Sequence, residues 1–305
     1  MPNGAPHFVL RTLYCSFQSF NFSSMHNIHP CLWFNGNAKE AAEFYCSLFP
    51  DSRITFDTPM VVNFNLHGQK FMGLNGGPMF TFNPSISMFV TSENNEEIDR
   101  LYARLMEGGM AMMPLDKYDW SEYYAFVQDK FGLAWQLYKG NYSSVNQKIT
   151  PCFLFTDSHF GKAEAAVKYY TGLFPSSSIN GILLYQENEG EQVAGKVKHS
   201  QFIIDEKVFM AMDGAGNHGF AFNEAISFVV ECKDQEEIDK YWNNLTANGG
   251  AESMCGWLKD PFGVSWQIIP ANIGQIMTDP DKGPGAMQAL MKMKKIVVKE
   301  LEERS

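Results

Sequence analysis

The chain has 305 residues, enough for about two domains, and 45% of them are hydrophobic, which excludes a disordered or low-complexity protein. With 24 Lys and Arg against 34 Asp and Glu, the formal net charge is −10, which disfavours a surface for nucleic acid or anionic membranes. No apolar run approaches the roughly 20 residues of a spanning helix, and six scattered cysteines without a CxxC pair indicate reduced thiols in the cytoplasm.

The order of segments follows from composition and from an internal repeat. Residues 1–26 hold a single Arg, no acidic residue and no secretory pattern, so we expect a disordered leader there. FYCSLFP at 44–50 returns as YYTGLFP at 169–175, and DKFGLAWQ at 129–136 returns as DPFGVSWQ at 260–267. The repeat predicts two tandem domains, 27–140 and 148–270, joined by a linker at 141–147 and followed by a helical tail at 271–305.

Each domain is expected to consist of two similar halves, and the two domains are expected to share the same order of elements. A strand over 28–34 precedes a helix that Asn37 would cap, with Glu40 as its box partner. Alternating strands follow at 61–66 and 71–74, and a buried strand at 86–90. Asn94, or Asp234 in the second copy, would cap another helix, and a last strand at 133–138 or 264–269 closes the copy. The class is α+β with mainly antiparallel sheets.

The half-repeat, with its aromatic pair late in the first helix and its D-x-F-G-x-x-W-Q closing strand, resembles the vicinal oxygen chelate superfamily of glyoxalases, bleomycin-resistance proteins and extradiol dioxygenases. More narrowly, it resembles the PhnB-like group, whose members often carry the label 3-demethylubiquinone-9 3-methyltransferase. The resemblance covers about residues 27–270. It implies tandem glyoxalase-like domains, each of two βαβββ units forming a cupped sheet, packed about a pseudo-two-fold axis.

The superfamily holds a metal inside the cup, and the resemblance carries its ligand positions onto this sequence. They fall on His29, near Ser85, near Asn75 and on Gln136 in copy one, and on Thr150, near Ala225, on Asp213 and on Gln267 in copy two. Such metals prefer imidazole and carboxylate, and a neutral amide is a weak ligand. His29, Gln136 and Asp213 are therefore weak metal candidates. We expect no tightly bound cofactor, with a divalent Zn, Ni, Mn or Fe ion as the alternative.

A cup without a metal can still bind a small molecule through an apolar lining and a few polar groups. Strand alternation places His29, Cys31 and Trp33 on one face. It also turns Gln136 and Gln267 away from their Trp neighbours, which are expected in the core. These five residues are the main ligand-binding candidates.

Two insertions distinguish the copies. Copy one has about ten extra residues over 113–125, which contribute Tyr118 and Tyr124 as ligand-binding candidates and Glu122 as a weak acid–base candidate. Surface decoration is the alternative interpretation of this loop. Copy two instead lengthens 176–198, where we expect an exposed hairpin or a mobile loop.

The preferred function is that of a PhnB-like protein that binds or sequesters a small molecule in one metal-poor cup, that of copy one. The alternative is a metal-dependent lyase, isomerase or dioxygenase, so whether the chain is an enzyme stays open. The methyltransferase label is disfavoured because alternating βα units are absent and the G-x-G-x-x-G at 214–219 leads into a strand. Neither nucleic acid nor membrane is expected as a partner, and further homo-oligomerisation is left open.

Overall fold

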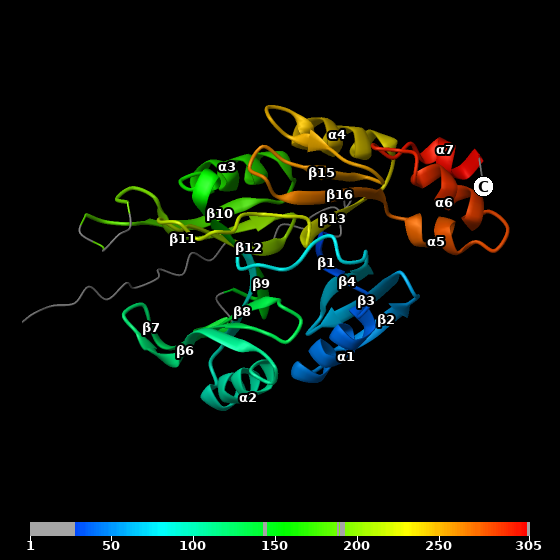
Figure 1. Cartoon of the computed structure of the whole chain (residues 1–305). Coiled ribbons are helices and arrows are strands. Elements are labelled where there is room, and N and C mark those ends of the chain that lie inside the picture. The colour runs from blue at the N-terminus through cyan, green and yellow to red at the C-terminus, as the bar shows by residue number, and fades with distance from the viewer. Residues whose placement is uncertain (1–27, 143–144, 188, 190–192, 304–305) are drawn as a thin grey trace, which may run out of the picture.

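The structure is a computed structural model that describes residues 28–142, 145–187, 189 and 193–303. The predicted leader at 1–26 lies outside the described residues. Two mixed eight-stranded sheets form the body, four helices of 11 or 12 residues pack on them, and a small helical tail lies at one end (Figure 1). No helix within the described ranges is long and apolar enough to cross a bilayer.

The elements repeat from copy one to copy two. Copy one contributes β1 (His29–Phe34), α1 (Ala38–Leu48), β2 (Arg53–Asp57), β3 (Val61–Leu66), β4 (Gln69–Asn75), β5 (Ile86–Ser92), α2 (Asn95–Leu105), β6 (Met110–Tyr118), β7 (Ser121–Gln128) and β8 (Ala134–Lys139). Copy two contributes β9 (Ile149–Phe155), the 3-10 turn η2 (Asp157–His159), α3 (Ala163–Leu173), β10 (Ser178–Leu184), β11 (Val197–Ile204), β12 (Lys207–Asp213), β13 (Ile226–Cys232), α4 (Gln235–Thr246), β14 (Ala251–Glu252), β15 (Trp257–Lys259) and β16 (Ser265–Pro270). The tail holds α5 (Ile273–Thr278), α6 (Gly283–Leu290) and α7 (Val298–Glu303). The predicted α+β class with a tandem repeat is confirmed.

Each sheet is built from one half of each copy. Sheet A has the order β14-β15-β16-β13-β1-β4-β3-β2 and is joined by the antiparallel pair β1–β13, in which His29 lies opposite Val229. Sheet B has the order β10-β11-β12-β9-β5-β8-β7-β6 and is joined by β5–β9, in which Phe89 lies opposite Thr150. The repeat in the sequence does not specify which halves pair. In the structure the first half of copy one pairs with the second half of copy two, and the second half of copy one pairs with the first half of copy two.

The core lies between the backs of the two sheets. One hydrophobic cluster includes residues from strands of both sheets and from all four long helices. Phe228 of sheet A packs edge to face on Phe153 of sheet B, with ring centroids 5.3 Å apart. Trp135 and Trp266 are fully buried in this cluster, as predicted. The opposite faces of the two sheets therefore point to the two ends of the molecule (Figure 1).

The D-x-F-G-x-x-W motif ties a turn to the core. Asp260 accepts hydrogen bonds from the backbone N–H groups of Phe262 and Val264 through Oδ1, and from the Trp266 indole and the Tyr170 hydroxyl through Oδ2. Asp129 makes the same bonds to the backbone and to Trp135. The Asp and Trp of the motif are thus structural, and they leave the final Gln to face away from the core.

Two of the predicted helix caps are confirmed and one is wrong. The side chains of Asn94 and Asp234 each accept from the N–H of the glutamate three residues later. Asn37 makes no side-chain cap bond. Instead Asn75, at the end of β4, accepts from Ala38 N at 3.0 Å. A cap supplied by a parallel neighbouring strand cannot be read from residues adjacent to the helix.

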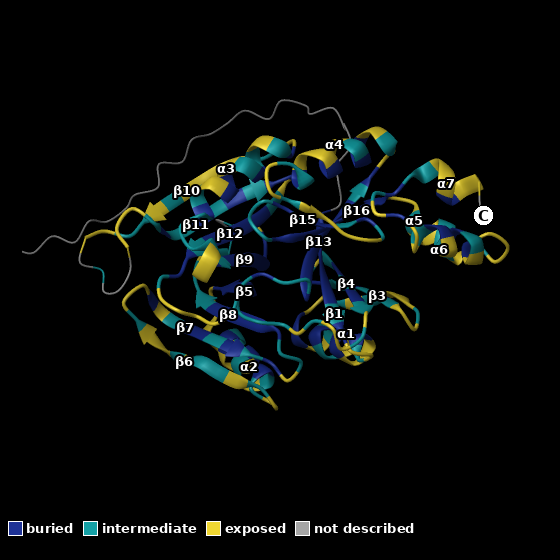
Figure 2. Cartoon of the chain, turned by 45° about the horizontal axis from the view of Figure 1, so that its top comes forward, coloured by how far each residue is buried: buried dark blue, intermediate teal, exposed yellow. Residues whose placement is uncertain are grey.

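The tail packs against sheet A through one side and is exposed on the other. Figure 2 shows buried strands through the middle of the molecule and exposed segments on β6, β10 and the tail helices. Backbone bonds from Cys255 N to Met293 O and from Gly256 N to Lys294 O fix the tail beside β15. The segment 176–198, expected to be an exposed hairpin or a mobile loop, contains β10 and the start of β11, which pair antiparallel.

Candidate functional site

Four of the predicted ligand-binding residues lie on the side of sheet A that points away from the core, which we call the A face. His29, Cys31 and Trp33 alternate along β1 toward this side, and Gln267 joins them from β16. His29 and Cys31 are buried, and Trp33 donates its indole N–H to Gly77 O at 2.7 Å. These residues come from both copies.

The chain's own tail covers the A face. A single apolar cluster joins sheet residues to tail residues: Cys31, Val229, Ile269, Ala289, Met293, Ile296 and Leu301. Ile296 and Leu301 have no exposed surface. The A face is therefore closed by segments that follow the second domain in the sequence.

A small polar network lies under the tail on the A face. Gln267 Nε2 donates to Ser227 Oγ at 2.9 Å, and the Cys31 thiol lies within hydrogen-bonding reach of both side chains. Burial raises the pKa of Cys31 to about 12, so the thiol is neutral at pH 7 and is not a ready metal ligand or nucleophile.

The equivalent side of sheet B, which we call the B face, carries the same network. Gln136 Nε2 donates to Ser87 Oγ at 2.8 Å, and Cys152 lies beside Gln136 with its pKa raised to about 12 by burial. The B face adds one group, because the Tyr124 hydroxyl donates to Gln136 Oε1 at 2.7 Å. Burial also raises the pKa of Tyr124, so this hydroxyl stays protonated.

Aromatic and methionine side chains surround the B-face network. The cluster consists of Phe89, Tyr124, Cys152 and Met210, with partly buried Met113, Tyr118, Phe126, Tyr138 and Met212 around them. Tyr118 stacks on Trp120 at a centroid distance of 5.2 Å and meets Tyr124 edge to face. No described residue of the tail belongs to this cluster. The predicted candidates Tyr118, Tyr124 and Gln136 thus lie together.

His199 and Glu122 lie at the margins of the B face. The His199 ring, on β11, is 6.4 Å from the Phe89 ring between centroids. Burial lowers the pKa of His199, so its imidazole is neutral at pH 7. Glu122 is exposed at the start of β7 and lines an open depression of about 510 Å³ together with Trp120 and Tyr138. Its acid–base role stays a prediction from the sequence.

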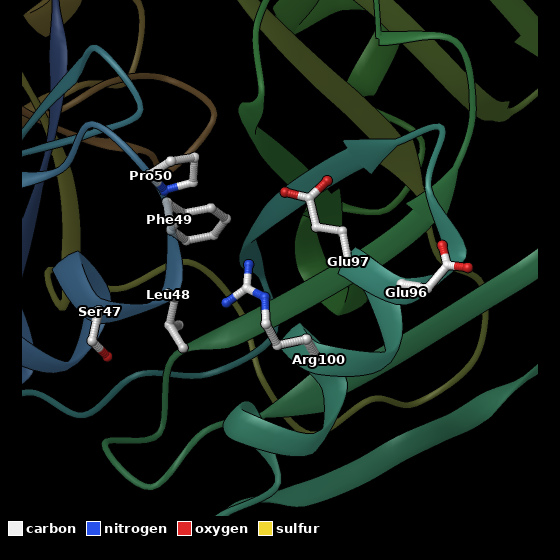
Figure 3. Close-up of a pocket in the computed structure, with 7 residues that line it drawn as sticks. All are labelled: Ser47, Leu48, Phe49, Pro50, Glu96, Glu97 and Arg100. Atoms are coloured by element: carbon white, nitrogen blue, oxygen red, sulfur yellow. The ribbon is translucent and has the colours of Figure 1, made fainter.

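A second open depression, of about 600 Å³, lies between the end of α1 and the start of α2 (Figure 3). Figure 3 shows Arg100 and Glu97 on α2 facing the segment that contains Phe49 and Pro50. Glu97 is already engaged, because Lys148 donates to it at 2.5 Å. The residues that line this depression are all different from the sequence-predicted site residues.

The side chains at the superfamily's metal positions do not fit a divalent metal. Asp213 faces the helix side of sheet B, where its carboxylate accepts from the backbone N–H groups of Gly161, Ala163 and Val197. The A face then offers one imidazole beside a neutral thiol and an amide, and the B face offers a thiol, hydroxyls and an amide. Within the described ranges, no group of three or more His, Cys, Asp or Glu could hold a metal ion. Neutral amides and thiols are poor replacements for carboxylates at such a site.

Sequence reasoning missed three features of the two faces. It placed the ligand positions of the central strands near Ser85 and Ala225, whereas the network uses Ser87 and Ser227, two residues later. The Ile-Ser pair that occurs at 86–87 and again at 226–227 could have identified them. His199 had no assigned role, and coverage by the tail has no local sequence pattern.

Comparison with known proteins agrees with this architecture. Two tandem copies, each contributing one unit of strands and a helix to each of the two sheets, form a glyoxalase-like fold. The model of the family described as 3-demethylubiquinone-9 3-methyltransferase matches residues 26–138 and again 147–269, so the chain belongs to that PhnB-like family.

The chain is also similar to proteins of known structure. A protein from Bacillus cereus described as a putative 3-demethylubiquinone-9 3-methyltransferase, PhnB protein, is 37% identical over 35% of this chain and 95% of its own, with a TM-score of 0.34. Glyoxalase I from Zea mays is 11% identical over 80% of this chain and 92% of its own, with a TM-score of 0.52. The second likeness concerns the fold alone. No curated protein matches the chain.

Proposed function

We propose that this protein binds a small molecule on the B face and does so without a metal. The observation that carries the proposal is the difference between two faces that share one polar network. The A face is covered by Ile296, Leu301 and their neighbours, whereas the B-face cluster includes no part of the tail that the structure describes. Ligand sites combine an apolar lining with a few placed polar groups, as the B face does.

The proposed site is not the cup of copy one that the sequence favours, because the candidates from that copy are divided between the two faces. Tyr118, Tyr124 and Gln136 stay together on the B face, where Cys152 and His199 join them from copy two. His29, Trp33 and Gln267 lie on the covered face.

Metal-dependent lyase, isomerase or dioxygenase chemistry is the weaker candidate, because the donor groups on both faces do not fit the metals that such chemistry uses. Methyl transfer, which the family's description names, is not carried over either. Both sheets mix parallel and antiparallel strands, and hairpins connect several of the neighbouring strands. A dinucleotide or S-adenosylmethionine fold instead alternates parallel strands with helices.

The matched pair Gln136 and Gln267 provides the test. Each is 6% exposed and each donates to a serine on a neighbouring strand. We expect Gln136→Leu to weaken binding of fragments found by ligand-observed NMR by roughly tenfold, about the value of one hydrogen bond, and Gln267→Leu to leave binding unchanged. Equal losses in both variants would contradict a site on the B face.

Elemental analysis of the dialysed protein tests the absence of a metal separately. We expect substoichiometric Zn, Ni, Mn and Fe, with the same values in His29→Ala. A stoichiometric metal that falls in His29→Ala would overturn the proposal in favour of the metal-dependent alternative.

A further inference from the structure

The charges around the B face restrict the ligand that it can take. Of the charged residues on the strands of sheet B, alternation from Tyr124 and its partners places Asp116 and Glu122 on this side, and both are exposed on the β6–β7 hairpin. Lys198, beside His199 at a bulge of β11, is ion-paired with Glu189 at 2.5 Å. The buried centre of the face therefore carries no ionised group among the described residues.

An ionised ligand at this centre would be buried without a counter-charge. The nearest polar groups are the Gln136 amide, the Tyr124 hydroxyl and the Cys152 thiol, all neutral at pH 7. His199, a titratable base in contact with the cluster, is neutral as well because its burial favours the uncharged form. Burying a charge without a partner is strongly unfavourable.

Ring faces dominate the rest of the lining. Phe89 and Tyr138 lie 5.5 Å apart between centroids on adjacent strands, and Tyr118, Trp120 and Tyr124 contact one another on the hairpin side. Aromatic side chains attract other rings by stacking and edge-to-face contact beyond the area that they bury. The methionines of the cluster can adapt to the outline of such a ring.

We infer that the B face takes an uncharged, flat aromatic molecule that carries a hydroxyl or carbonyl group, the polar group meeting Gln136 and Tyr124 while the ring lies among the aromatic side chains. This inference rests on the proposed function and narrows it to a ligand class.

Four matched probes test the inference on the full-length protein: 2-naphthol, its saturated counterpart decahydro-2-naphthol, 2-naphthoate and 2-naphthylmethylammonium. Methyl NMR of 13C-methionine protein separates the two faces, because Met113, Met210 and Met212 report on the B face and Met72, Met277 and Met293 on the A face. We expect 2-naphthol to shift the B-face methyls and to bind several-fold to about tenfold more tightly than each of the other three.

A variant pair tests the ring contact. Trp120 is 55% exposed, so Trp120→Leu keeps the fold while removing one ring face. We expect it to weaken 2-naphthol binding about threefold to tenfold and to leave decahydro-2-naphthol unchanged. Trp257→Leu on β15 of sheet A, which removes an edge-to-face contact with Trp33, is the control and should change neither.

The outcomes separate the inference from the function on which it rests. If 2-naphthoate, the ammonium probe or decahydro-2-naphthol binds at the B-face methyls as tightly as 2-naphthol, the ligand class is wrong and the proposed site stands. If neither the probes nor a fragment library with charged and saturated members shifts these methyls, the proposed function itself fails.

Discussion

Asp260 shows how one buried carboxyl serves a turn, an indole and a phenol at once. Burial raises its pKa to about 6, although hydrogen bonds from Tyr170, Trp266 and two backbone N–H groups partly oppose that effect. In the unfolded chain the same group has the ordinary pKa of about 3.9. Between these values the folded state holds a proton that the unfolded state has lost.

The stability of the protein should therefore depend on pH through Asp260. As the pH rises from about 4 to 6, ionisation favours the unfolded state first, so the contribution of Asp260 falls by up to roughly 3 kcal/mol and is constant above that range. The measurement is the free energy of unfolding of the wild type minus that of Asp260→Asn, followed by urea denaturation across pH. A difference that instead rises with pH would mean that the four donors favour the ionised carboxyl.

At the residue scale the sequence was a good guide wherever the cause is local. Alternation along a strand separated Gln136 from Trp135 and Gln267 from Trp266, and the structure agrees. Local sequence reasoning fails at Asn37. The acceptor that caps the helix in its place, Asn75, lies on β4, which is distant in the sequence and is brought there by pairing with β1. Asp213 is a similar case, since its face depends on the register of β12 against β9.

The two faces differ in the element that stands beside them. In sheet B the long β6–β7 hairpin extends the edge, whereas in sheet A the corresponding strands β14 and β15 have only two and three residues. In sheet A the tail lies beside these short strands. Gln235 of α4 fixes the tail by donating to Ile296 O and accepting from Val298 N. The sequence predicts a helical tail after the second domain, but it does not predict which surface the three short helices contact.

Loosening the tail should expose Cys31 and spare Cys152. Ile296→Ala removes a buried side chain from the tail cluster and should cost about 2–4 kcal/mol of local packing. We expect the alkylation rate of Cys31, mapped by mass spectrometry, to rise at least tenfold while that of Cys152 stays constant. Met291→Ala, at a position that is 62% exposed, is the control. Equal acceleration of both thiols would indicate general unfolding instead of tail release.

At the scale of the whole molecule, the copies in the sequence are not the units of the sheets. The β1–β13 and β5–β9 pairs lie at the centre of the two sheets, so each copy alone would leave two unpaired central strand edges. Unpaired edges associate with other strands. The tandem repeat is easily recognised in the sequence, but the same side chains can satisfy pairing within or between copies, and only the folded chain distinguishes them.

Separating the copies tests this arrangement. Residues 1–142 and 145–305 expressed together as two chains should purify as a 1:1 complex, and each expressed alone should self-associate or precipitate. Size-exclusion chromatography with light scattering measures both outcomes. Two stable monomers would contradict the exchange of halves between the sheets.

The pairing of halves across the copies also determines the order in which the sheets can form during synthesis on the ribosome. β1 can pair with β13 only after Val229, the partner of His29, has been synthesised about 200 positions further along the chain. At translation rates of roughly 5–20 residues per second, that interval is on the order of 10–40 seconds. The central pair of sheet B, β5–β9, can form much earlier, because β9 comes soon after β8 in the sequence. The nascent chain therefore completes the half that bears the B face first, and until β13 is synthesised the edge of β1 that pairs with it stays unpaired.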